Sequence, residues 1–145
     1  MAAPIPIAIY GRDGKIVEAI RELLLPDIDV VHTSLTLPTA STELPLLLSG
    51  ALSTAPSSGL GSNASRAESE RLVPKAVFFG GGVPEEEVEL VQRLVLEKLG
   101  EGEGDGKEGG PKFLRVTREE VLAAGAKGPD PGVIAGIYRR KVEGL

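Results

Sequence analysis

The sequence predicts an α/β fold: a three-layer, Rossmann-like domain in which helices cover both faces of a four-stranded parallel sheet. Two observations carry this prediction. Four short apolar runs, bounded by glycine or proline, are typical of buried strands, and the segments between them have apolar residues at helical spacing. Right-handed crossovers leave two strand orders open, the Rossmann order 3-2-1-4 and the flavodoxin-like order 2-1-3-4.

A change in the spacing of the apolar residues indicates where the first strand ends and the first helix begins. Residues 5–10 form a short β-branched run, whereas in residues 14–25 the apolar side chains fall on one helical face. Pro26 ends that helix, because a proline cannot continue the hydrogen-bond ladder. Residues 28–35 are expected to form the second strand.

The middle of the chain is expected to hold a short helix, a loop, and the third strand with its helix. We place the short helix at residues 42–52, with Pro45 in its first turn. The Ser-, Ala- and Gly-rich residues 53–71 are expected to be a flexible surface loop. Residues 75–79 form the third strand. Residues 85–99 form a helix whose three leading glutamates complement the positive end of its dipole.

The last third of the chain begins with an acidic, glycine-rich segment, residues 100–110, expected to be a flexible loop. Residues 112–116 form the fourth strand. A Thr-x-x-Glu capping box then starts a short helix over residues 118–124, and residues 133–142 form the final helix. All 145 residues are therefore expected to fold as a single domain.

Composition excludes several classes of function. A formal net charge of −5 and a pI near 5.0 argue against binding to nucleic acid or to an anionic membrane surface. The absence of cysteine excludes disulfides and thiolate zinc sites. No secretory signal is visible, and no stretch approaches the ~18 consecutive apolar residues that a membrane span needs. We therefore predict a cytoplasmic protein.

The glycine turn after the first strand is the sharpest candidate for a binding site. Gly11 and Gly14 permit a tight turn and a close backbone approach. Amide groups at the start of the following helix point outward, so a phosphate can accept bonds from residues 12–15, assisted by the charge of Arg12 or Lys15. The alternative is a plain turn in which the glycines only relieve steric strain.

This turn also carries a resemblance to a known family. Residues 7–16, IAIYGRDGKI, resemble the opening of NmrA-like, atypical short-chain dehydrogenase/reductases, in which a strand is followed by Gly-x-x-Gly-x-Ile-Gly. Gly11, Gly14 and Ile16 fall on this pattern, and Val17 stands in the place of the third glycine. The third strand and its acidic helix also look like the corresponding elements of these proteins.

The resemblance implies an NAD(P) site at the carboxyl edge of the sheet. Residues 11–15 would face the phosphates, Thr33 and Ser34 would lie at the adenosine ribose, and residues 80–82 would pass close to the cofactor. The residues expected to bind the cofactor are Gly11, Arg12, Asp13, Gly14, Lys15, Thr33, Ser34, Gly80, Gly81 and Gly82.

No catalytic constellation accompanies this site in the sequence. Enzymes of the wider reductase group need a Tyr-x-x-x-Lys pair. This chain has Tyr138-Arg139-Arg140-Lys141, one residue short, which we interpret as an ordinary helix surface. His32 is the single histidine, and a histidine at a strand end is more often structural than a general base. Without partner His or Cys residues, no metal site is predicted.

The predicted function is the binding of NAD(P) or another phosphate-bearing nucleotide, without catalysis. The alternative is a non-enzymatic module that self-associates as a homodimer, through a sheet edge or an apolar helix face. A small enzyme that uses His32 or Asp13 for acid–base chemistry ranks last.

Overall fold

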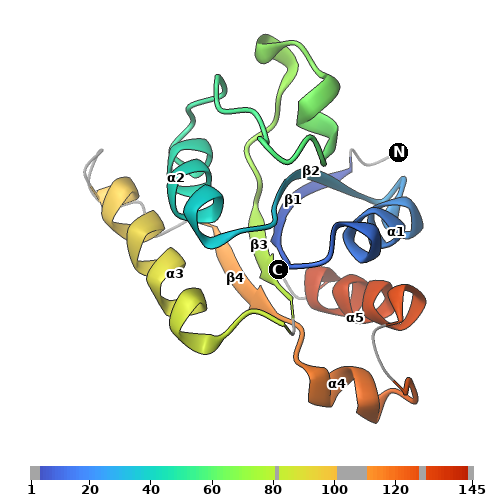
Figure 1. The fold of residues 1–145 in the computed structure, drawn as a ribbon. Helices are drawn as coiled ribbons and strands as arrows, with labels where there is room; N and C mark the ends of the chain where they lie inside the picture. Colours follow the sequence, from blue (N-terminus) through green and yellow to red (C-terminus); the bar gives the residue numbers. More distant parts are fainter. Residues whose placement is uncertain (1–3, 81, 101–110, 128–129, 144–145) are drawn as a thin grey trace.

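The computed structural model describes residues 4–80, 82–100, 111–127 and 130–143, arranged as a central sheet between two layers of helices (Figure 1). Its elements are β1 (Ile5–Tyr10), α1 (Gly14–Leu24), β2 (Ile28–Ser34), α2 (Leu37–Leu48), the 3-10 helices η1 (Ser62–Ser65) and η2 (Glu68–Glu70), β3 (Ala76–Phe79), α3 (Glu85–Gly100), β4 (Lys112–Arg115), α4 (Arg118–Ala123) and α5 (Pro131–Glu143). All predicted strands and helices are present, and all except α2 begin and end within two residues of their predicted bounds. Of the predicted loop at residues 100–110, Gly100 ends α3 and residues 101–110 lie outside the described residues.

The strands run parallel in the order β2-β1-β3-β4. This confirms the α/β prediction and selects the flavodoxin-like order; the Rossmann order 3-2-1-4 is not the one formed. β1 lies between β2 and β3, with Ile7 opposite both Val30 and Ala76. The chain leaves β1 toward β2 and later returns on the other side of β1, so the strand order reverses between β1 and β3. In open α/β sheets, ligands bind in the crevice at that point.

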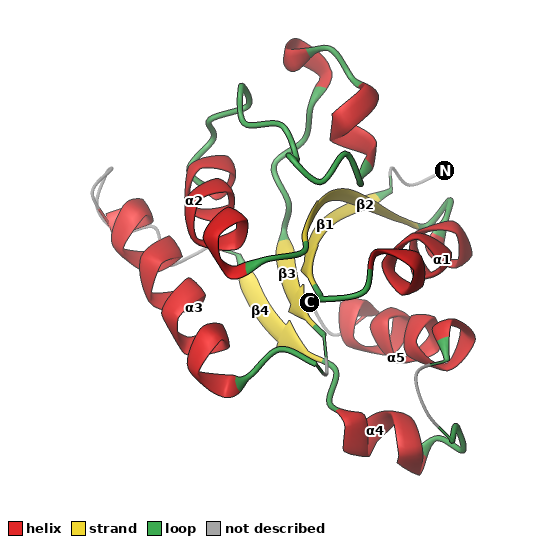
Figure 2. Cartoon of the chain, viewed as in Figure 1, coloured by secondary structure: helices red, strands yellow, loops and turns green. Residues whose placement is uncertain are grey.

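Both faces of the sheet are covered, which is why its central strands are apolar throughout. Figure 2 shows α1 and α5 on one side of the sheet and α2 and α3 on the other. Successive side chains of β1 alternate between the two layers. Ile7 and Ile9 join the core formed with α1 and α5, whereas Ala8 and Tyr10 join the core formed with α2 and α3.

Helix α2 begins five residues earlier than the predicted start at residue 42. The Thr36 hydroxyl accepts a hydrogen bond from the amide of Thr39, and Pro38 lies in the first turn, where a missing N–H costs nothing. The prediction placed Pro45 in that first turn, but Pro45 lies inside the helix and is buried. The capping threonine was therefore the stronger start signal.

Residues 53–71 lie along the outer edge of β2. The amide of Thr33 donates to the carbonyl of Leu60 over 3.2 Å, and Arg66 forms a 2.6 Å ion pair with the buried Asp29. Asn63 is fully buried, and its side chain exchanges two 3.0 Å hydrogen bonds with the backbone of Leu72. These contacts cover an edge strand that would otherwise expose unpaired backbone groups.

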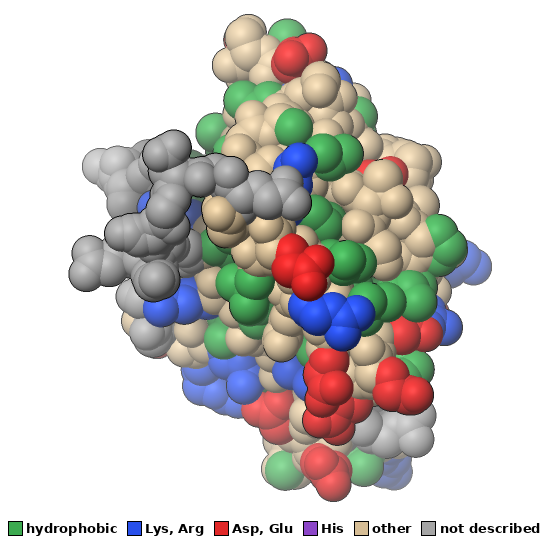
Figure 3. Space-filling view, turned by 90° about the vertical axis from the view of Figure 1, so that its left-hand side faces the viewer, with side chains coloured by type: hydrophobic (Ala, Val, Ile, Leu, Met, Phe, Trp, Pro, Cys, Tyr) green, Lys and Arg blue, Asp and Glu red, His purple; other side chains and the backbone are tan. Residues whose placement is uncertain are grey.

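The surface around this core mixes charges of both signs. On the side where α3 lies, acidic and basic side chains stand next to one another (Figure 3). Across the described ranges, no helix combines the length and the apolar character that crossing a membrane requires.

Candidate functional site

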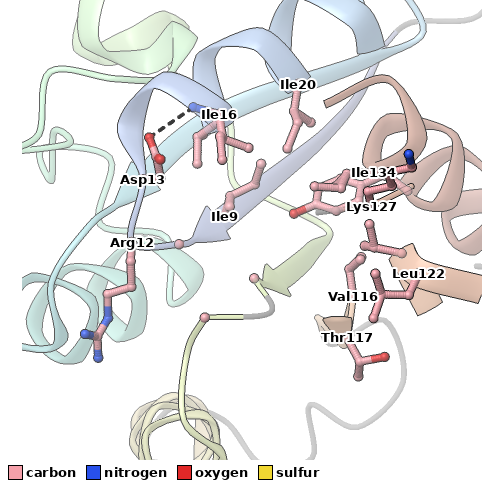
Figure 4. Close-up of a pocket in the computed structure, with 16 residues that line it drawn as sticks. Ile9, Arg12, Asp13, Ile16, Ile20, Val116, Thr117, Leu122, Lys127 and Ile134 are labelled. Atoms are coloured by element: carbon pink, nitrogen blue, oxygen red, sulfur yellow. Dashed lines mark hydrogen bonds between the residues drawn. The ribbon is translucent and has the colours of Figure 1, made fainter. Parts of the chain in front are cut away.

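A cavity of about 580 Å³ lies at the carboxyl ends of β1, β3 and β4, between α1 on one side and α4 and α5 on the other (Figure 4). It opens at the point where the strand order reverses, where the fold predicts a ligand site. Its lining residues are Ile9, Gly11, Arg12, Asp13, Ile16, Val17, Ile20, Gly80, Gly82, Val116, Thr117, Val121, Leu122, Lys127, Ile134 and Tyr138.

Two aliphatic walls enclose most of this cavity. Ile16 and Ile20 project from α1, and Leu122 and Ile134 come from α4 and α5 on the other side, with Ile9 at the end of β1 between them (Figure 4). The α1 wall follows from the spacing of the helix, because residues four apart share one face. Binding sites for small molecules are of this kind: largely apolar, with a few polar groups that orient the ligand.

Gly11, Gly80 and Gly82 form part of the rim. A Cβ on Gly80 would lie 3.6 Å from the Cα of Gly11, so the ends of β1 and β3 approach closely here. A Cβ on Gly82 would meet nothing within 4 Å. Gly14, in contrast, packs against the side chains of Leu35 and Leu60 and does not line the cavity. Gly81 lies outside the described residues.

The start of α1 is already occupied by a carboxylate of the chain itself. Asp13 is the N-cap, and its Oδ1 accepts hydrogen bonds from the amides of Lys15 at 3.0 Å and Ile16 at 3.3 Å. We expected a phosphate to accept hydrogen bonds from the amides of residues 12–15. The Lys15 amide is already bonded to Asp13, and the negative charge of Asp13 would repel a phosphate at this position. An Asp directly before a helix is a recognised capping signal, so the sequence contained this information.

Arg12 is held by an ion pair to α3. Its Nη2 lies 2.5 Å from Oε1 of Glu87, which also accepts a 2.6 Å hydrogen bond from the hydroxyl of Tyr10. Burial and the bond to Glu87 raise the pKa of Tyr10 to about 12, and the bonds from Tyr10 and Arg12 lower the pKa of Glu87. Figure 4 shows the Arg12 side chain directed away from Ile20 and the apolar walls.

Thr33 and Ser34 do not line the cavity, so the structure does not bring them together with Gly11 and Gly80. Both are buried, because residues 57–60 cover the end of β2; the Ser58 hydroxyl donates to the Thr33 carbonyl over 2.7 Å. His32 is buried beside them, with Nε2 2.9 Å from Oε1 of Glu43. Burial lowers the pKa of His32, although Glu43 opposes that shift. His32 is therefore a buried residue paired with Glu43, and it does not line the cavity.

Tyr138 is the cavity residue that sequence reasoning placed wrongly. We interpreted it as part of a helix surface, but its side chain is 1% exposed and its ring stacks on Phe78, with centroids 4.0 Å apart. A signal was available, because Ile134, Tyr138 and Val142 are four residues apart and define one apolar face of α5. The neighbouring Arg139 faces outward and pairs with Asp27 at 2.7 Å.

Within the described parts of the chain, no three His, Cys, Asp or Glu side chains gather in a way that could hold a metal ion. The residues with polar side chains that line the cavity are Arg12, Asp13, Thr117, Lys127 and Tyr138.

Comparisons with known proteins give one partial match. No family model matches the chain, and no solved structure matches it. A curated relative from Aspergillus oryzae, named Kojic acid related protein 6, is 30% identical over 90 residues, which cover 62% of this chain and 50% of the relative. The chain thus spans about half the length of the curated relative that it matches. The resemblance to NmrA-like reductases stays a prediction.

Proposed function

We propose that this protein binds a phosphate-bearing nucleotide, with NAD(P) as the first candidate, and that it acts as a binding protein rather than an enzyme. The observation that carries the proposal is the cavity at the crevice between β1 and β3. Its volume of about 580 Å³ falls among those of small-molecule sites, and Gly11, Gly80 and Gly82 allow a ligand to approach the backbone closely.

The lining suggests how such a ligand lies. Its ring packs between the aliphatic walls, and its phosphates lie beside the exposed side chain of Lys127. The side chain of Lys127 is exposed and has no ion pair or hydrogen bond with the described residues, so its charge is free for an anion. The start of α1 is less suitable, because Asp13 already fills it.

Isothermal titration calorimetry with NADP, NAD, FMN and ATP tests the proposal. Kojic acid joins the panel because the name of the Aspergillus relative refers to it. Lys127→Gln should weaken the binding of phosphorylated ligands about fivefold, the effect of losing one charged contact of about 1 kcal/mol. Lys75→Gln is the matched control, because it removes the same charge far from the cavity. Lys75 directly precedes β3, at the amino ends of the strands, whereas the cavity lies at their carboxyl ends. No heat with any nucleotide at millimolar concentration would overturn the proposal.

A self-associating module is the second candidate. The observation that favours it is the outer edge of β4, which in the described part of the sheet pairs with β3 alone. A second copy of the chain could add its own strand there, because an open edge presents unpaired N–H and C=O groups. Light scattering over a concentration series decides this, and a strict monomer at all concentrations would rule it out.

A further inference from the structure

The hydroxyl of Tyr138 is a polar group of the cavity wall. The residue lines the cavity with only 1% of its surface exposed, and its oxygen makes no hydrogen bond with any residue in the described ranges. The oxygen is not among the fully enclosed side-chain atoms without a partner, so it is accessible from the cavity. Burial raises the pKa of Tyr138, so the group keeps its proton at neutral pH and can donate a hydrogen bond.

The ring that carries this hydroxyl is held in place by a stacking partner and by the anchoring of its helix. It stacks on the fully buried Phe78 at an interplanar angle of 17°. The next residue, Arg139, fixes α5 against the end of α1 through hydrogen bonds to the carbonyls of Leu23 and Leu24, at 2.8 and 3.2 Å. The Tyr138 oxygen therefore occupies a defined position, which is what a group that orients a ligand requires.

The side chains around the cavity do not satisfy this hydroxyl. Most of the wall is aliphatic, and Arg12, Asp13 and Thr117 have partners of their own. Lys127 also lines the cavity and makes no hydrogen bond with Tyr138 in the described chain. A molecule that enters the cavity can therefore bond this hydroxyl in place of water. A purely aliphatic molecule would leave the hydroxyl unpaired, whereas a ring with a polar atom on its inner edge would satisfy it.

We propose that the Tyr138 hydroxyl is a ligand-binding group, and that the cavity takes a planar ring with a hydrogen-bonding atom on the edge that faces Tyr138. This inference rests on the proposed function and narrows it to the ring of the ligand. In a nucleotide, that ring is the base, nicotinamide or flavin, and its polar edge meets Tyr138 while the phosphates lie beside Lys127.

The first test measures the free protein. Tyr138→Phe removes an unpaired hydroxyl, so the melting temperature should stay the same or rise. Tyr10→Phe is the matched control, because it removes a hydroxyl bonded to Glu87 at 2.6 Å and should lower the melting temperature by about 2–4 °C. A comparable fall in Tyr138→Phe would show that its hydroxyl has a partner within the chain, which would overturn the inference.

The second test uses two probes that differ by one hydroxyl, toluene and p-cresol, titrated into ¹⁵N-labelled protein and followed by NMR. Tyr138→Phe should weaken p-cresol binding about five- to tenfold, equivalent to one hydrogen bond, and leave toluene binding unchanged. If p-cresol binds the wild type and Tyr138→Phe with equal affinity, Tyr138 is not a ligand-binding group, and only the ring site of the inference remains. If neither probe binds the wild type, the cavity is no ring site and the inference falls with it. If p-cresol binding depends on Tyr138 but calorimetry finds no nucleotide, the inference holds and the nucleotide proposal fails.

Discussion

Gly61 provides the sharpest test of how residues 53–71 are seated on the sheet. Its φ of +113° and ψ of 150° lie in a region that is almost exclusive to glycine. A Cβ built on Gly61 would lie 2.5 Å from the carbonyl oxygen of Val31 and 2.8 Å from the Cα of His32. Both are backbone atoms of β2, so no side chain can move aside to make room.

The cost of Gly61→Ala follows from these values. The backbone conformation alone costs about 1–3 kcal/mol for a residue with a Cβ. The loop must also retreat by nearly 1 Å to restore an ordinary contact, which weakens the hydrogen bond from Thr33 to Leu60, a loss of about 1 kcal/mol. We expect the free energy of unfolding to fall by about 2–4 kcal/mol in total. That is a large part of the ~5–15 kcal/mol that stabilises a typical domain.

Urea unfolding followed by far-ultraviolet circular dichroism measures this change, since the chain has no tryptophan. Gly59→Ala is the matched control in the same loop: its φ is +77°, but its Cβ would meet nothing within 4 Å. It should lose only the conformational part, about 1 kcal/mol. Equal losses in the two variants would refute the idea that close contact between Gly61 and β2 matters.

Two further predictions concern the ends of β1 and β2. Because burial lowers the pKa of His32, the unfolded chain takes up a proton more readily, and stability should fall as the pH drops below about 6.5, by at most ~1.4 kcal/mol per pH unit. Urea titrations between pH 7.5 and 5.5 should show this slope in the wild type and lose it in His32→Gln; a slope that survives would contradict the assignment. Asp13→Ala should cost about 1 kcal/mol, because the amides of Lys15 and Ile16 lose their acceptor, whereas Asp13→Ser keeps a capping oxygen and should cost less. Thermal unfolding compares them, and equal stability of all three proteins would mean that the cap contributes nothing.

The sequence was informative about the site where the signals were local. Gly11 and Gly80 were placed at the strand ends from their position after apolar runs, and both line the cavity. It was misleading where burial depends on distant segments. Thr33 and Ser34 follow an apolar run in the same way, yet residues 57–60 cover them, and no feature near β2 indicates this contact.

The sequence by itself determined the succession of strands and helices and the edge of the sheet at which the cavity lies. Both depend on periodicity and on glycine or proline at the boundaries, which act over a few residues. Only the tertiary structure decided the strand order, because both orders have the same local pattern and differ in which elements pack together. It also decided that the Tyr138 ring lies in the core against Phe78, since that contact joins elements 60 residues apart in the chain. The chemistry of the cavity therefore depends on long-range packing, which no local pattern encodes.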